Sequence, residues 1–116
     1  MANKFGGRPM GGGMGGMNMN ALMRQAQKMQ QDIADKKEEL KAREYSAESG
    51  GGAVKATVNG SNELLSLELS PEIVDPEDVE MLSDLVTVAV NQALRAAAAD
   101  AEAEMNRLTG GMGGML

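Results

Sequence analysis

The chain has 116 residues and a net charge of −6, and it contains no cysteine and no histidine. Without those two side chains it lacks disulfides, thiolate nucleophiles and the usual base that titrates near neutral pH, so the composition argues against an enzyme or a zinc site. The charge is unevenly distributed, since residues 1–55 carry a net +3 and residues 56–116 a net −9. One half of the chain is therefore mildly basic and the other strongly acidic.

The size indicates one small domain with a thin core. Residues 1–17 and 110–116 are rich in Gly and Met, and we expect flexible tails there, with residues 18–109 forming the folded domain. One Phe, one Tyr and no Trp leave only aliphatic side chains and Met to fill the core. Burial of apolar surface against a second copy would compensate, so we expect an obligate homodimer. Neither a signal peptide nor a run of about 18 apolar residues is present, which favours a cytoplasmic protein without a membrane span.

The first helix is expected from Asn18 to Arg43, with Asn18 or Asn20 as its cap. Its apolar residues recur at spacings of three and four, with Lys36 as the one polar break, and they are Met19, Leu22, Ala26, Met29, Ile33 and Leu40. Three heptads are too few for a secure free coiled coil, so this helix must pack on a sheet or on a partner helix.

The middle of the chain changes to the alternation of β-strands. Strands are expected at 44–49, 53–59 and 63–70, with the glycines 50–52 breaking the first and Asn59-Gly60 forming a hairpin turn. The side chains expected on one face are Val54, Ala56 and Val58 in the second strand and Leu65, Leu67 and Leu69 in the third. We therefore predict a three-stranded antiparallel meander with one buried face.

The last helix is expected from Pro76 to Leu108, after Pro71 has ended the third strand. Asp75 is the predicted cap, Pro76 the first helical residue, and Gly110 the stop. The order helix, three-stranded antiparallel sheet, helix (α-β-β-β-α) predicts the α+β class. The residues that we expect in the core or the dimer interface are Leu65, Leu67, Leu82, Leu85, Val86 and Val90.

Three motifs have simpler explanations than a binding site. The glycines at 11, 13 and 16 match a dinucleotide-binding pattern, but no strand precedes them. The methionines of the N-terminal segment lack the Cys or His that would support a copper(I) site. Asn59-Gly60-Ser61 matches a glycosylation acceptor but is better explained as the hairpin turn. We expect no cofactor, no metal and no small-molecule substrate.

Basic and amide side chains line the outer face of the first helix. Arg24, Gln27, Lys28 and Gln31 follow helical spacing, and Lys37 and Lys41 form a second pair four residues apart. Such a strip fits phosphates and base edges. A solvated helix face with Lys–Glu pairs explains the same residues, so both interpretations stay open on this evidence.

Several segments resemble the YbaB/EbfC family of nucleoid-associated proteins. The strings at 21–30, 51–60, 84–94 and 105–111 resemble, in order, its opening helix, its Gly-rich hairpin strand, its last helix and its closing segment. The resemblance implies an intertwined, tweezer-like homodimer that binds double-stranded DNA, influences gene expression, and is associated with the nucleoid. The DNA-contacting residues that it suggests are Arg24, Lys28, Lys37, Lys41, Arg95 and Arg107.

Two considerations oppose this interpretation. Asp100, Glu102 and Glu104 precede Arg107 and are expected to repel phosphates, which would confine DNA contact to the first helix. The negative net charge and the Met-rich ends also fit an alternative, an acidic dimeric adaptor or chaperone-like module that binds a protein partner.

Overall fold

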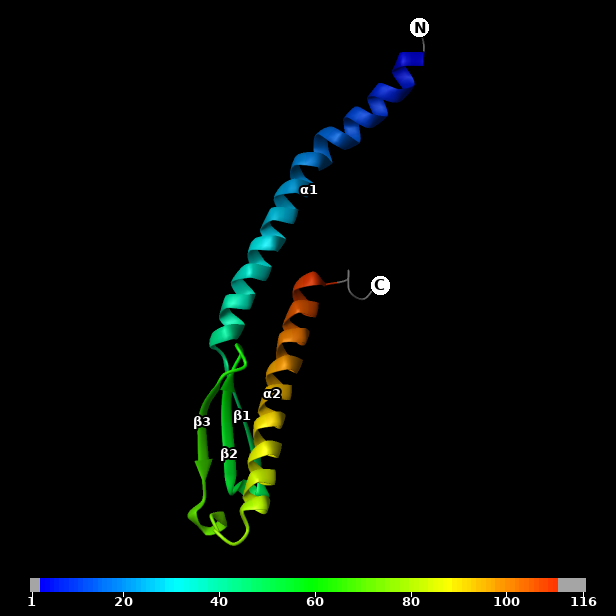
Figure 1. Ribbon diagram of the computed structural model, residues 1–116. Coiled ribbons are helices and arrows are strands. Elements are labelled where there is room, and N and C mark those ends of the chain that lie inside the picture. The colour runs from blue at the N-terminus through cyan, green and yellow to red at the C-terminus, as the bar shows by residue number, and fades with distance from the viewer. Residues whose placement is uncertain (1–2, 111–116) are drawn as a thin grey trace. The chain divides into compact units, whose positions relative to one another are not determined.

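The computed structural model describes residues 3–110, and its elements follow the predicted order (Figure 1). Helix α1 spans Asn3–Ala42, three strands follow, and helix α2 spans Val79–Thr109. The α+β prediction is confirmed. The chain divides into two compact units, residues 1–34 and 35–116, which we call the N-terminal unit and the C-terminal unit. Within the described residues, no helix is both long and apolar enough to cross a membrane.

Helix α1 begins at Asn3, fifteen residues before the predicted start. Asn18 and Asn20 consequently lie inside the helix and do not cap it. The helix ends at Ala42, one residue earlier than predicted. Residues 111–116 of the predicted C-terminal tail lie outside the described part of the chain.

The strands form one antiparallel sheet in the order β1-β2-β3, with β1 at Glu44–Ser49, β2 at Val54–Asn59 and β3 at Leu64–Leu69. The predicted alternation of β2 is confirmed, since Val54, Ala56 and Val58 are fully buried. Gly50–Gly52 form a 3-10 turn between β1 and β2, and all three have positive φ, which explains the run of glycines.

Strand β3 departs from the strict alternation that was predicted. Leu67 and Leu69 lie opposite Ala56 and Val54, but the register shifts so that Leu64, not Leu65, lies opposite Val58. Leu65 is the extra residue of a β-bulge. The turn before β3 is also longer than predicted, since β2 ends at Asn59 and β3 begins at Leu64. Its residue with positive φ is Asn62, and not Asn59 or Gly60.

Helix α2 starts later than predicted, and its cap is Asp78 instead of Asp75. The Asp78 carboxylate accepts a hydrogen bond from the backbone N–H of Met81 at 3.2 Å. Asp75 instead accepts from the N–H of Glu77 at 2.9 Å and closes a turn around Pro76. Both aspartates are suitable helix caps. The Asp75 carboxylate is engaged in the local turn, so the helix begins after Asp78.

The core joins α2 to β1 and β2, and its buried side chains are small. Ala89, Ala93 and Ala97 recur every four residues on α2 and pack against the buried valines and alanine of β2. Leu85, Val86 and Val90 are half-buried around the first of these clusters, and Leu82 is also half-buried. Leu65 and Leu67 are exposed, at 47% and 37%, because α2 lies over β1 and β2 and leaves β3 uncovered (Figure 1).

The β2–β3 turn is held against the end of α1 by Gly60. Its backbone N–H donates to the carbonyl oxygen of Arg43 at 3.1 Å. A side chain at Gly60 would overlap the carbonyl group of Leu40 and press on the backbone of Lys41. Glycine is therefore required here for close backbone approach, and the contact fixes the hairpin tip to the last turn of α1.

Replacing Gly60 with Ala should destabilise the fold, because the new methyl group has no room between two backbones. We expect a loss of about 2 kcal/mol or more in the free energy of unfolding, measured by thermal or urea unfolding at fixed protein concentration. Ser61→Ala, at the exposed neighbouring position, is the matched control and should unfold like the wild type. A Gly60→Ala protein as stable as this control would contradict the close packing.

Candidate nucleic-acid interface

The uneven charge of the sequence coincides with the two structural units. Residues 1–34 carry four basic residues and one acidic residue, for a net +3. Residues 35–116 carry seven basic and sixteen acidic residues, for a net −9. Because a polyanion is attracted by Lys and Arg and repelled by carboxylates, the N-terminal unit is the electrostatically suitable part of the chain.

Arg24 and Lys28 lie in the N-terminal unit on α1 and are exposed. The side chain of Lys28 is 77% exposed and forms a long ion pair with Asp32 at 3.5 Å. An exposed pair of this kind contributes little to stability, so a phosphate can replace it at small cost. Met19, Leu22 and Met23 on the same stretch of α1 are also more than half exposed.

The other four predicted DNA-contacting residues lie in the acidic C-terminal unit. Lys37 and Lys41 are exposed at the end of α1, and Lys41 pairs with Glu38 at 3.1 Å. Arg95 is exposed on α2. Arg107 is 73% exposed but donates to Glu104 at 2.9 Å. Lys41 and Arg107 are therefore paired with carboxylates, and all four residues belong to the unit with the negative net charge.

A cluster of charges centred on Arg43 joins the end of α1 to α2. The Arg43 guanidinium donates to Glu39 at 3.0 Å, to Asp100 at 2.8 Å and to Glu104 at 2.9 Å. Tyr45, on β1, donates to the same Asp100 carboxylate at 2.5 Å. One guanidinium thus connects the end of α1 to α2, and its planar set of N–H donors suits several carboxylates at once.

Two further cations complete this cluster. Lys36 pairs with Glu39 at 2.8 Å and lies 3.8 Å from Glu104, and Arg107 pairs with Glu104 as well. Three basic residues therefore face three acidic residues, and the cluster is electrically neutral. The predicted repulsion of phosphates by Asp100 and Glu104 is consequently reduced, whereas Glu102 stays exposed.

The cluster shifts the pKa values of its members in the directions that ion pairing requires. Hydrogen bonds from Tyr45 and then Arg43 lower the pKa of Asp100, and the hydrogen bond from Arg43 lowers that of Glu104 although burial opposes it. Lys36 and Arg43 likewise lower the pKa of Glu39. Burial, followed by the bond to Asp100, raises the pKa of the Tyr45 hydroxyl. The carboxylates are thus held in their charged form.

Sequence reasoning assigned no role to Arg43. Its partner Glu39 lies four residues earlier, and this spacing is typical of an ion pair on a helix, so that contact could have been predicted. Asp100 and Glu104, in contrast, lie 57 and 61 residues away along the chain, and no local pattern connects them to Arg43.

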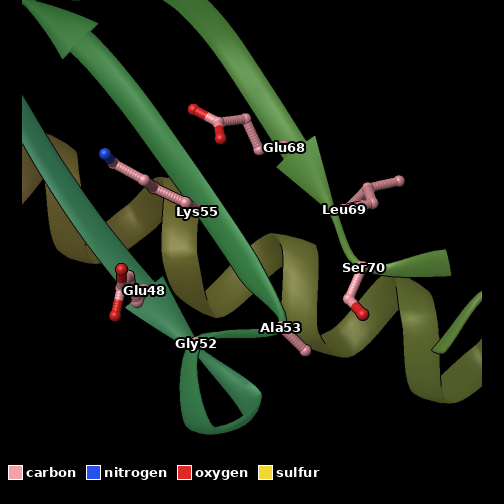
Figure 2. A pocket seen from close by; sticks show the side chains of 7 residues that line it. All are labelled: Glu48, Gly52, Ala53, Lys55, Glu68, Leu69 and Ser70. Carbon is pink, nitrogen blue, oxygen red and sulfur yellow. The ribbon is translucent and has the colours of Figure 1, made fainter. Parts of the chain in front are cut away.

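The opposite face of the sheet from α2 carries an open hollow of about 430 Å³ around Lys55 (Figure 2). Glu48 and Glu68 lie on either side of Lys55 in the strand register. This acidic, open setting suits neither a phosphate nor an enclosed substrate. Throughout the described residues, no group of three or more acidic side chains is placed to hold a metal ion.

Acid should weaken the fold through the Arg43 cluster. Carboxyl groups whose pKa is lower in the folded than in the unfolded chain stabilise the fold above their unfolded values, and that stability is lost as the pH falls through the folded values. We expect the free energy of unfolding, measured by urea titrations between pH 6 and pH 3, to decrease as the pH is lowered. Glu104→Gln should reduce this slope, whereas Glu102→Gln, on the exposed side of the same helix, should keep it. Identical slopes for the two variants would refute the role of the cluster.

Comparison with known proteins points to one family. Residues 14–112 match the model of the YbaB/EbfC DNA-binding family. A nucleoid-associated protein of Clostridium acetobutylicum is 50% identical over 86% of this chain and 89% of its own length. One from Ruminiclostridium cellulolyticum is 49% identical over 95% of this chain and 94% of its own. These matches do not favour the protein-adaptor alternative.

A solved structure supports the fold independently. The crystal structure of an uncharacterized Helicobacter pylori protein superposes with a TM-score of 0.65 at 24% identity, covering 77% of this chain and 94% of the other. The family match extends over most of the sequence, in the order expected from the helix, the hairpin and the last helix. The chain belongs to the YbaB/EbfC DNA-binding family.

Proposed function

We propose that this protein is a non-enzymatic, nucleoid-associated protein that binds double-stranded DNA as a homodimer, chiefly through Arg24 and Lys28 of α1. The observation that carries the proposal is the division of charge between the units, with a net +3 on residues 1–34 and −9 on residues 35–116. The family match and the names of the relatives support DNA as the partner and the nucleoid of the cytoplasm as the location.

The contacts are expected to be mainly electrostatic. Exposed Lys and Arg side chains replace condensed counterions on the DNA phosphates, which gives affinity with little sequence dependence. Lys37 and Lys41 would extend the contact toward the end of α1. Arg95 and Arg107 would contribute less, because they belong to the acidic C-terminal unit and Arg107 is already paired with Glu104. Two-fold symmetry would let two weak sites act together.

The dimer is argued from the apolar surface of the isolated chain. The buried core of the C-terminal unit is made largely of Ala and Val, whereas the leucines of β3 are 37–48% exposed. Val79, Met81 and Val88 of α2 add to the exposed apolar residues. An uncovered apolar surface of this kind marks an interface on a small protein. We propose that a second copy covers β3, and the family resemblance suggests the intertwined, tweezer-like arrangement.

Substitutions in α1 should weaken DNA binding in a salt-dependent way. The double variant Arg24→Ala/Lys28→Ala should bind a labelled duplex more weakly and reduce the slope of log affinity against log salt by about two, one for each lost phosphate contact. Fluorescence anisotropy at low and physiological salt measures both quantities. The single variant Lys28→Ala has Lys55→Ala as its matched control. Lys55→Ala removes the same charge from the sheet and should bind DNA like the wild type. Equal affinities and slopes for all variants would refute the site.

Introducing a charge on β3 should break the proposed dimer. Leu67→Asp would place a carboxylate in the apolar interface, where burying a leucine contributes about 1.5–3 kcal/mol for each subunit. We expect the molar mass from light scattering to fall to that of the 12.1 kDa chain. Ser66→Asp, one residue away on the other face of the sheet, should stay dimeric. A wild-type chain that is monomeric at micromolar concentration would refute the dimer itself.

A further inference from the structure

A small apolar crevice lies between the end of α1, the β2–β3 turn and the second half of α2. It has a volume of about 250 Å³ and is lined by Lys37, Leu40, Lys41, Gly60, Ala101 and Met105. That volume is below the range of about 300–1,000 Å³ that holds small-molecule ligands. The crevice is therefore of a size for protein side chains. All its lining residues belong to the C-terminal unit.

We infer that the crevice is the docking site for the C-terminal segment of the same chain, residues 111–116. This inference concerns the packing of the C-terminal unit and does not depend on DNA binding. The segment reads Gly-Met-Gly-Gly-Met-Leu. Its three apolar side chains match the apolar lining, and methionine is the side chain that best fills gaps of irregular shape.

The end of α2 brings this segment close to the crevice. Gly110 is the C-cap, its positive φ of 56° ends the helix, and its N–H donates to the carbonyls of Asn106 and Arg107. Met105 and Ala101 precede Gly110 by five and nine residues, about 7 and 14 Å along the helix. Extended chain spans about 3.4 Å per residue, so Met112 reaches about 7 Å from Gly110, far enough for Met105, and Met115 reaches about 17 Å, far enough for both.

The sequence of the segment also suits a tight return path. Three glycines separate or precede its methionines, and glycine adopts the backbone angles that a reversal over few residues requires. Once docked, the methionine side chains would contact Leu40 of α1 and Met105 of α2 together. The segment would thereby brace the end of α1 against α2 beside the Arg43 cluster.

The test uses the full chain with its methionine methyl groups labelled with ¹³C. We expect nuclear Overhauser effects from the Met112 or Met115 methyl group to Met105 or Leu40. They should arise within one chain in a mixture of labelled and unlabelled protein. Absence of these signals, or signals only between chains, would overturn the proposal. Signals from Met10 or Met14 in their place would overturn it as well.

Two variants test whether the segment occupies the crevice. Ala101→Leu fills the crevice and should remove the signals from Met112 and Met115. The double variant Met112→Ser/Met115→Ser should speed amide hydrogen exchange over residues 101–109 by about three- to tenfold, because an apolar contact that protects the last turns is lost. Met10→Ser/Met14→Ser is the matched control and should exchange like the wild type. Unchanged exchange in the C-terminal variant, or signals that survive Ala101→Leu, would refute docking at this crevice.

Discussion

The contact on which the C-terminal unit most depends is the one between Arg43 and three carboxylates. Arg43 directly follows α1, and its guanidinium bonds to Glu39 of that helix and to Asp100 and Glu104 of α2. Glu104 is only 7% exposed, so its charge must be compensated within the fold, and Arg43 supplies this together with Arg107 and Lys36. The same contact joins the end of α1 to α2 and neutralises part of the negative charge of α2.

The small side chains of the core have a related consequence. Alanines at every fourth position let α2 lie close to β2, but they bury little area, and β3 is left with exposed leucines. A chain built in this way has apolar surface to share with a second copy. The acidic residues are concentrated in this C-terminal unit, whereas the basic excess lies in the N-terminal unit. In the function that we propose, the C-terminal unit serves assembly and the N-terminal unit contacts DNA.

The sequence was most informative where the determinants of structure are local. Alternation at Val54, Ala56 and Val58 predicted the buried face of β2, and the run of glycines predicted the break between β1 and β2. The prediction of the cap was wrong because Asp75 and Asp78 are both suitable, and a turn at Asp75 decides between them. The bulge at Leu65 and the bonds of Arg43 depend on register and on partners about 60 residues away, which no local pattern reveals. The positions of Arg24 and Lys28 on α1 followed from helical spacing alone, but their use for DNA rests on the family.

The central claim, that DNA contacts the N-terminal unit and avoids the acidic one, is tested most directly by nuclear magnetic resonance. A short duplex would be titrated into ¹⁵N-labelled protein at low salt while the amide shifts of both units are followed. The account predicts shifts that saturate and are concentrated between residues 18 and 34, with the largest near Arg24 and Lys28. Shifts concentrated on α2 or on the sheet, with α1 unaffected, would contradict it.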